Sequence, residues 1–282
     1  MLLSDAGGSP HFPDCFSLSL SEEPIYIGRH GGRRFYTLLL PSDGEGAGQA
    51  AEKNVGAAGT LPGSGAAGAV LDVGSERWVN RRSSFRELQG EEFWISARAY
   101  QIARWDRESR FCGRCGGRQV TAAKELAKEC PICGHREYPR IAPAMIVAVV
   151  SRGRLLMAHA NKHREGLYSV LAGFVEPGES LEGCVAREIM EEAGIEVGAI
   201  RYFSSQSWPF PYSLMIAFTA EAASEEITIE PEEIGEAGWF RPEEITELPM
   251  IPPRMSVSRS LIDWFVDSYG DETTRSVHHS RE

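Results

Sequence analysis

The sequence has no long apolar run, no excess of basic side chains, and no basic segment followed by an apolar one at its start. Its longest purely apolar stretch, residues 144–150, is far shorter than the roughly 20 residues of a transmembrane helix. The 40 acidic side chains outnumber the 29 basic ones and give a formal net charge of −11, which disfavours non-specific binding to nucleic acid or to an anionic membrane. Since no secretory signal is visible, we expect a cytoplasmic enzyme or binding protein with no membrane partner.

The hydrophobic pattern predicts strands mixed with two or three helices, which indicates an α/β or α+β fold. Ile95, Ala99, Ile102 and Trp105 recur at the spacing of an amphipathic helix. The β-branched run 145–150 is typical of a strand buried on both faces. Further strands are expected over 154–158, 168–172, 200–204, 214–220 and 238–240, and a final helix over 257–265.

The N-terminal third is less informative. Short apolar stretches between glycines and prolines, such as 35–40, predict the strands of a small β-containing domain. Between 42 and 69 the chain consists mainly of glycine, alanine and polar residues. Such a segment cannot bury enough apolar surface to offset its ordering entropy, so we expect a mobile loop.

Four of the six cysteines form two pairs, Cys112-x2-Cys115 and Cys130-x2-Cys133, with fourteen residues between the pairs. A glycine follows each pair and permits the tight turn that directs two sulfurs at one ion. Four thiolates at this spacing are typical of a closed, structural Zn²⁺ site. The alternatives are free thiols or disulfides, and a reducing cytoplasm disfavours the latter.

Zinc ribbons often bind nucleic acid, so a zinc-ribbon nucleic-acid-binding regulator is a competing interpretation. Between the cysteine pairs, however, Arg118, Lys124 and Lys128 are opposed by Glu125 and Glu129. A surface that follows a phosphate backbone needs a one-sided basic run instead. The sequence therefore favours a role for the ribbon as a scaffold.

Residues 173–195 contain a predicted helix with clustered carboxylates. Ser180 is a suitable N-cap and Gly194 a suitable C-terminal stop, with a loop over 173–178 before them. Apolar residues four positions apart, Leu181, Val185 and Ile189, form the buried stripe.

Glu188, Glu191 and Glu192 lie at positions i, i+3 and i+4, so they share one helical face. Like charges at this spacing oppose helix formation, and one interpretation is an ordinary solvated surface. Beside a glycine-containing loop, however, the same carboxylates are suitable ligands for Mg²⁺ or Mn²⁺, which prefer oxygen donors. A bound metal would neutralise their repulsion and leave positions for water and phosphate oxygens.

The same residues match a family signature. The pattern is G-x5-E-x7-R-E-U-x-E-E-x-G-U, with U a bulky aliphatic residue, and every specified position from Gly173 to Ile195 is filled. The chain therefore resembles the Nudix hydrolases, which cleave a nucleoside diphosphate linked to another moiety. The resemblance implies an α/β/α sandwich and the attack of water on a pyrophosphate phosphorus.

A second segment, Ser205-Gln-Ser-Trp-Pro-Phe-Pro-Tyr-Ser213, contains aromatic residues between prolines. Because proline cannot join a central strand ladder, we expect a rigid projecting loop whose aromatic planes stack on a nucleobase or on nicotinamide. A hydrophobic turn packed on the core is the alternative. The segment is similar to the SQPWPFPxS array of NADH pyrophosphatases, also known as NAD-cap hydrolases of RNA, with Ser207 in place of a proline.

The zinc site, an additional N-terminal domain and the segment 138–143 also match that family, from about Phe93 to the C-terminal helix. The implied organisation is an N-terminal domain over 1–110 that contains the loop 42–69, a zinc ribbon over 111–138, a Nudix domain over 139–270 and a tail over 271–282. The family also implies a homodimer.

The resemblance implies roles for individual residues. Glu188, Glu191 and Glu192 would be catalytic and would bind Mg²⁺ or Mn²⁺ together with the carbonyl of Ala172 and with Glu233. Substrate would contact Phe174, Tyr138, Glu125, Gln206, Ser207, Trp208, Pro209, Phe210, Pro211, Tyr212, Ser213 and Met255.

The expected reaction is metal-dependent hydrolysis of NAD(H) to NMN(H) and AMP, and removal of the NAD cap from RNA. Two or more metal ions would bridge the pyrophosphate and the glutamates, and Glu191 or Glu192 would accept the proton of the attacking water. The nearest alternative is a Nudix pyrophosphohydrolase that acts on ADP-ribose or dinucleoside polyphosphates.

Overall fold

The structure is a computed structural model that describes residues 2–5, 25–30, 33–37 and 90–280. It divides into two compact units, Met1–Arg140 and Ile141–Glu282, which are described separately below. The loop expected over 42–69 lies outside the described residues. Within the described ranges, the helices lack the length and apolar character needed to cross a bilayer.

The described residues of the first unit form two small sheets and one long helix. Helix α3 (Gly90–Glu108) contacts strands β2 and β3, and its buried side chains include Ala99, Ile102 and Trp105, which confirms the predicted helix. The first sheet has the order β1-β3-β2 and the second the order β4-β5-β6. Their strands are β1 (Leu2–Asp5), β2 (Ile25–His30), β3 (Arg33–Thr37), β4 (Val120–Thr121), β5 (Lys128–Glu129) and β6 (Arg136–Glu137).

A six-stranded mixed sheet forms the centre of the second unit. Its order is β10-β11-β7-β8-β12, with β9 paired to β7. Strand β7 pairs parallel to β11 and antiparallel to β8 and β9. The strands are β7 (Ala142–Ser151), β8 (Arg154–Ala160), β9 (Leu171–Phe174), β10 (Val197–Trp208), β11 (Ser213–Ala222) and β12 (Ile234–Phe240).

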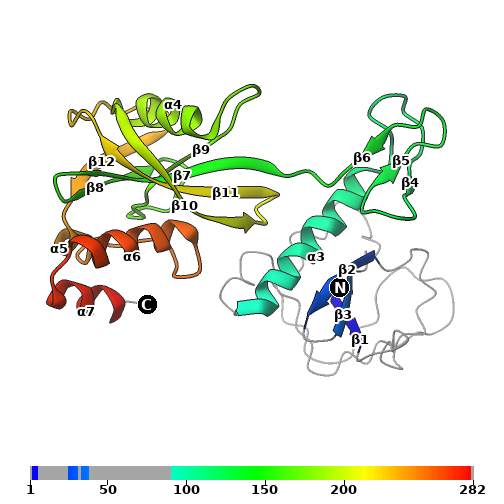
Figure 1. Ribbon diagram of the computed structural model, residues 1–282, viewed down its shortest axis with the longest axis horizontal. Helices are drawn as coiled ribbons and strands as arrows, with labels where there is room; N and C mark the ends of the chain where they lie inside the picture. Colours follow the sequence, from blue (N-terminus) through cyan, green and yellow to red (C-terminus); the bar gives the residue numbers. More distant parts are fainter. Residues whose placement is uncertain (1, 6–24, 31–32, 38–89, 281–282) are drawn as a thin grey trace. The chain divides into compact units, whose positions relative to one another are not determined.

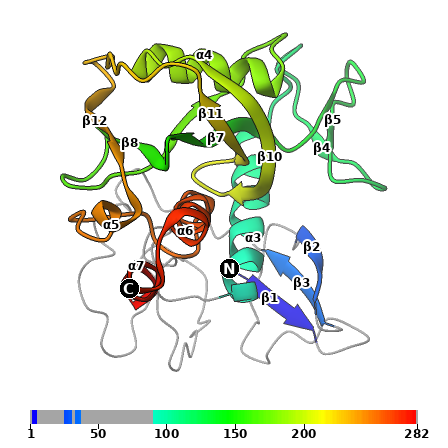
Figure 2. The ribbon, with the colours of Figure 1, turned by 60° about the vertical axis from the view of Figure 1, so that its left-hand side comes forward.

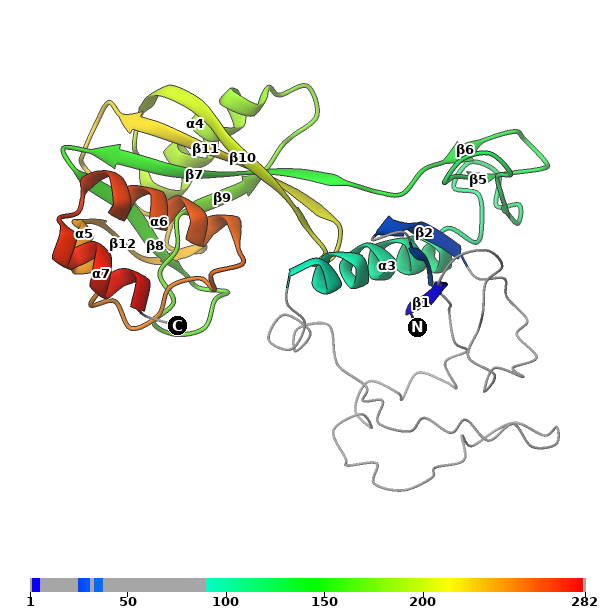
Figure 3. The ribbon, with the colours of Figure 1, turned by 60° about the horizontal axis from the view of Figure 1, so that its bottom comes forward.

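Two helices cover opposite faces of this sheet, because the side chains of β7 alternate between them. Met145, Val147 and Val149 pack in one core with α4 (Leu181–Ala193). Their neighbours Ile146 and Ala148 pack in the other core with α6 (Val257–Tyr269). Figures 1 and 3 show α4 and α6 on the two sides of the sheet. The expected α/β/α sandwich and the doubly buried strand are confirmed.

Helix α4 begins and ends where the sequence predicts. The Ser180 side chain accepts a hydrogen bond from the backbone N–H of Gly183 at 3.1 Å, which makes it the N-cap. Gly194 ends the helix in the left-handed conformation, with φ 68°. Val185 and Ile189 are fully buried, so the predicted apolar stripe faces the core.

Two strand predictions need correction. The strand expected over 168–172 lies at 171–174 instead, because β9 pairs with Ala144–Val147 of β7 and so includes the first two residues of the expected glycine loop. The aromatic segment is also not wholly a loop. Gln206, Ser207 and Trp208 continue β10 and pair with β11, which leaves only 209–212 as the turn. The prolines lie in that turn, where they remove no ladder hydrogen bond.

The C-terminal region is helical beyond the expected final helix. Helices α5 (Pro242–Ile245) and α7 (Glu272–Ser280) lie beside α6, as Figure 2 shows. The segment expected as a tail therefore contains α7. His278 of α7 is fully buried and its Nε2 lies 2.6 Å from Asp263 Oδ1. The other expected domain boundaries stay predictions.

The core beneath α4 gives a first prediction. Replacement of Ile189, which is fully buried, with alanine removes apolar contacts and leaves a cavity. We expect Ile189→Ala to lower the free energy of unfolding by about 2–4 kcal/mol, measured by urea denaturation. The neighbouring Met190 is 43% exposed, and Met190→Ala is the matched control. Equal losses in the two variants would contradict the assignment of the buried face.

Candidate active site

A cavity of about 540 Å³ lies in the second unit and is lined by eight of the expected site residues. Helix α4 contributes Glu188 and Glu192, and the turn before β12 contributes Glu233. The end of β10 contributes Trp208, and the turn after it contributes Phe210. The expected residues that line the cavity are Ala172, Phe174, Glu188, Glu192, Trp208, Phe210, Ser213 and Glu233.

Glu188 reaches the cavity by passing directly over Gly173. A Cβ atom at position 173 would lie 1.9 Å from Cδ of Glu188, which is far inside van der Waals contact. Only glycine at the end of β9 therefore lets the glutamate take this position. This contact gives a steric reason for the first glycine of the family signature.

The cavity shifts the proton affinity of its carboxylates. Burial, together with the charges of Glu188 and Glu233, raises the pKa of Glu192 to about 7. Burial also raises the pKa of Glu188, although Arg187 opposes that rise. Partly desolvated carboxylates that repel one another favour a bound cation, since it would compensate all of their charges at once.

The donor set fits a divalent metal, although the oxygens are not already drawn together. Carboxylates of Glu188, Glu192 and Glu233 line one cavity with the backbone of Ala172, and all of these are the oxygen donors that Mg²⁺ and Mn²⁺ prefer. Among the described residues, only the four cysteines form a group whose ligand atoms all lie within 4.8 Å of one another. Three glutamates that do not already close around one point leave positions for a metal that also binds substrate.

Glu191 does not face the cavity with its neighbours. Its side chain is 59% exposed and pairs with Arg187 at 3.0 Å. Of the three helix glutamates expected at the metal, Glu188 and Glu192 line the cavity and Glu191 does not, and the role of Glu191 stays a prediction.

Arg187 ties α4 to the loop that precedes it. Its guanidinium donates to both carboxylate oxygens of Glu179, at 2.8 and 3.0 Å, and to the backbone carbonyl of Phe174 at 3.0 Å. The hydrogen bonds from Arg187 and from the Glu176 backbone N–H lower the pKa of Glu179 to about 2. The Glu179–Arg187 pair thus holds the loop in place, while Phe174 remains 58% exposed at the cavity.

The aromatic turn is anchored to the start of α6. Gln206 donates to the backbone carbonyl of Met255 at 2.7 Å and accepts from the backbone N–H of Val257 at 2.8 Å. Trp208 and Phe210 form an edge-to-face pair with ring centroids 5.3 Å apart. The two rings therefore stand together at one end of the cavity.

Several expected substrate contacts lie outside the cavity lining. They are Gln206, Ser207, Pro209, Pro211, Tyr212 and Met255. Gln206 and Met255 act on the site through the anchor just described. At the start of α6 the lining residues are Ser256, Val257 and Ser258, so the structure places this end of the site one to three residues after Met255.

Tyr138 and Glu125 belong to the first unit. The Tyr138 hydroxyl donates to Glu125 at 3.3 Å, and Arg136 also pairs with Glu125 at 2.7 Å. The structure thus brings the two expected substrate contacts together on the ribbon. Tyr138 is 53% exposed, and its part in binding stays a prediction.

The sequence reasoning missed Lys162, which also lines the cavity. It lies in the loop between β8 and β9, and its charge opposes the rise in the pKa of Glu192. No motif marks this loop, and its place beside Glu233 depends on contacts between residues about 70 positions apart. The local basic run Lys162-His163-Arg164 in an acidic chain was the available signal.

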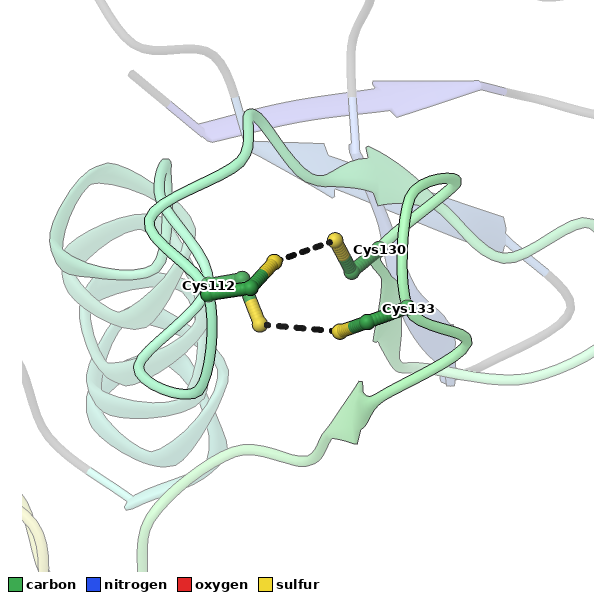
Figure 4. A group of neighbouring side chains, drawn as sticks. Cys112, Cys130 and Cys133 are labelled. Carbon is green, nitrogen blue, oxygen red and sulfur yellow. Dashed lines mark hydrogen bonds between the residues drawn. The ribbon is translucent and has the colours of Figure 1, made fainter.

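The four cysteines form a separate centre in the first unit. Sγ of Cys112 lies 3.7 Å from that of Cys133, and Sγ of Cys115 lies 3.5 Å from that of Cys130. Figure 4 shows the labelled sulfurs around a common centre. Tetrahedral Zn–S bonds separate sulfurs by about 3.8 Å, so the residues fit zinc.

Comparisons with known proteins agree with both parts of the chain. The NUDIX domain profile matches residues 139–265, and the NADH pyrophosphatase zinc ribbon domain profile matches residues 107–138. The predicted ribbon is therefore confirmed.

The chain is also similar to curated proteins named NAD-capped RNA hydrolase NudC. The protein of Stutzerimonas stutzeri is 45% identical over 195 residues, which cover 69% of this chain and 70% of the relative. That of Escherichia coli is 47% identical over 192 residues, which cover 68% and 71%. A crystal structure of a NUDIX hydrolase from Nitrosomonas europaea aligns with a TM-score of 0.48 at 23% identity, over 57% of this chain and 94% of that one.

The close approach at Gly173 gives a second prediction. In Gly173→Ala the new methyl group must displace the Glu188 carboxylate, whose atoms would lie 1.9–2.3 Å away. A displacement of about 1 Å at a reacting group costs on the order of a hundredfold in rate. We expect such a loss in kcat for the activity proposed below, with Gly198→Ala as the control because nothing lies within 4 Å of a Cβ there. An unchanged kcat in Gly173→Ala would contradict the steric argument.

The Glu179–Arg187 pair gives a third prediction, on stability and pH. Because Arg187 lowers the pKa of Glu179 from 4.5 to about 2, the pair stabilises the fold above pH 4.5, and the effect is lost as the pH falls toward 2. We expect the difference in melting temperature between the wild type and Glu179→Gln to shrink over that interval. The exposed Glu196 provides the control variant Glu196→Gln. A difference that does not depend on pH would show that the carboxylate charge is not involved.

Proposed function

The chain belongs to the Nudix hydrolase family whose members carry an NADH pyrophosphatase zinc ribbon, and on that premise we propose that it hydrolyses the pyrophosphate bond of NAD(H) and removes the NAD cap from RNA. The products are NMN(H) and AMP from the free dinucleotide. From capped RNA they are NMN and RNA with a 5′-monophosphate.

One observation carries this proposal: a buried glutamate, a partly buried glutamate and a pair of aromatic rings line the same cavity. Glu188 and Glu192 suit the diphosphate end of a substrate through a bound cation. Trp208 and Phe210 offer the flat apolar surfaces on which a nicotinamide or adenine ring stacks. A dinucleotide that joins two ring systems through a diphosphate requires both features.

The chain's own residues support each part of the hydrolysis. A bound Mg²⁺ or Mn²⁺ would polarise the phosphorus and acidify water. Water then adds to one phosphorus, the P–O bond to the bridging oxygen breaks, and the water proton must be accepted by a base. Glu192 is better suited to this step than Glu191, because it lines the cavity and burial raises its pKa to about 7.

The ribbon supports the proposal as a scaffold. Its four sulfurs face one centre, so no ligand position remains for water or substrate. Exposed Tyr138 and Glu125 lie on the same ribbon and are proposed to contact substrate. A regulator that only binds nucleic acid would have no need of the glutamate cavity. The homodimer and the cytoplasmic location stay predictions of the sequence.

The deciding experiment is a product assay with zinc-loaded protein and added Mg²⁺ or Mn²⁺. NADH, NAD⁺, NAD-capped RNA, ADP-ribose and diadenosine polyphosphates are compared by separation of the nucleotide products. We expect the highest kcat/KM with NAD(H) or NAD-capped RNA. Faster cleavage of ADP-ribose or of a dinucleoside polyphosphate would replace the proposed substrate, and tight RNA binding without hydrolysis would refute the enzymatic assignment.

A fourth prediction concerns Glu192. Glu192→Gln keeps the shape of the side chain but removes its charge and its capacity to accept a proton, so we expect kcat for NADH to fall by about 10²–10⁴-fold. Circular dichroism and the melting temperature should show an intact fold. The exposed Glu182 of the same helix gives the control Glu182→Gln. An unchanged kcat at saturating Mg²⁺ would overturn the role of Glu192.

A further inference from the structure

The cavity contains one strongly basic side chain that the mechanism has not used. Among the residues that line it, Lys162 is the only lysine or arginine. Its charge acts on Glu192 across the cavity, but no ion pair within 4.0 Å joins it to a carboxylate in the described part of the chain. The ammonium group is therefore available to a ligand.

Neighbouring contacts fix the loop that carries Lys162. The backbone N–H of Asn161 donates to the carbonyl of Glu233 at 2.8 Å. The Asn161 side-chain amide donates to the carbonyls of Pro231 and Glu232 at 2.9 and 3.2 Å. These bonds join the β8–β9 loop to the turn that holds Glu233. The backbone positions of Lys162 and Glu233 are therefore fixed relative to each other.

A glycine gives this anchor the space it needs. A Cβ on Gly235 would lie 2.8 Å from the side-chain oxygen of Asn161. Asn161 can therefore pack closely on the start of β12 because residue 235 has no side chain. A lysine on a loop without such an anchor would lose more side-chain and backbone entropy on binding a ligand.

The charges of the cavity favour an anionic ligand at this position. Glu188, Glu192 and Glu233 line the same cavity as Lys162, and a bound divalent cation would neutralise them. Once they are neutralised, they no longer compete for the Lys162 ammonium. A diphosphate keeps oxygens that a metal does not cover, and an ammonium group is a strong donor to such oxygens.

We infer that Lys162 binds a phosphate oxygen of the substrate's diphosphate and that Asn161 is the residue that positions it. This inference rests on the proposed function, because it assigns Lys162 to the same cavity and the same substrate class. The diphosphate would then be held both by the bound metal and by a direct contact from Lys162.

The test compares ligands that differ only in the diphosphate. Calorimetry measures the binding of ADP and of adenosine to zinc-loaded protein, with and without added Mg²⁺, for the wild type, Lys162→Gln and Lys162→Arg. Loss of a charged hydrogen bond weakens binding by on the order of tenfold. We therefore expect Lys162→Gln to bind ADP about tenfold more weakly and adenosine as before, and Lys162→Arg to restore most of the ADP affinity.

A matched control lies two residues away on the same loop. Arg164 is exposed and is not among the residues that line the cavity, so Arg164→Gln removes one positive charge without the proposed contact. If Arg164→Gln weakens ADP binding as much as Lys162→Gln does, the effect is general electrostatics and the inference is wrong. Asn161→Ala should reproduce part of the Lys162→Gln loss, since it releases the loop.

The outcomes separate this inference from the proposed function. Equal ADP affinities in the wild type and Lys162→Gln would overturn the role of Lys162, even if NADH is hydrolysed. Weaker binding of adenosine as well as ADP would also overturn it, because the lysine would then support the pocket as a whole. Selective loss of ADP affinity in a protein that fails to cleave NADH would uphold the diphosphate contact and refute only the proposed substrate.

Discussion

The close approach of α4 to β9 is the constraint on which the rest of the site depends. Glu188 lies where a Cβ of residue 173 would be, so the helix can come this near only because that residue is glycine. Arg187 holds the other side of the contact through Glu179 and the Phe174 carbonyl. One steric and one electrostatic device thus direct Glu188, and with it Glu192 one turn later, into the cavity.

This arrangement places carboxylates that repel one another in a partly desolvated cavity. Burial raises the pKa values of Glu188 and Glu192, so in the absence of a cation the protein tends to retain a proton there. The well-packed helices and strands on both faces of the sheet provide the stability that tolerates this. A divalent ion relieves the repulsion, and the same desolvation that is costly without the ion strengthens its binding.

Features encoded within a short stretch of sequence could be predicted, and those that depend on distant contacts could not. The caps of α4, its buried stripe and the cysteine centre each rest on residues close in the chain. The continuation of β10 through Trp208 depends on pairing with β11, and the prolines concealed it. The α7 helix, the anchor between Gln206 and the start of α6, and the position of Lys162 all depend on contacts that no local pattern reveals.

The carboxylates of α4 rest on a local sequence pattern, whereas the rest of the cavity lining depends on long-range contacts. Two of the three carboxylates, Glu188 and Glu192, lie on one continuous segment from β9 through α4, so most of the metal-binding chemistry can be inferred from consecutive residues, whereas Glu233 comes from the turn before β12. The rest of the lining combines the end of β10 and the turn after it, the start of α6 and the β8–β9 loop. Gln206 holds the end of β10 to the start of α6, and Asn161 holds the β8–β9 loop to the turn that contains Glu233. Because these anchors lie outside the signature helix, substitutions in them are expected to change how the substrate is held while Glu188 and Glu192 stay in place.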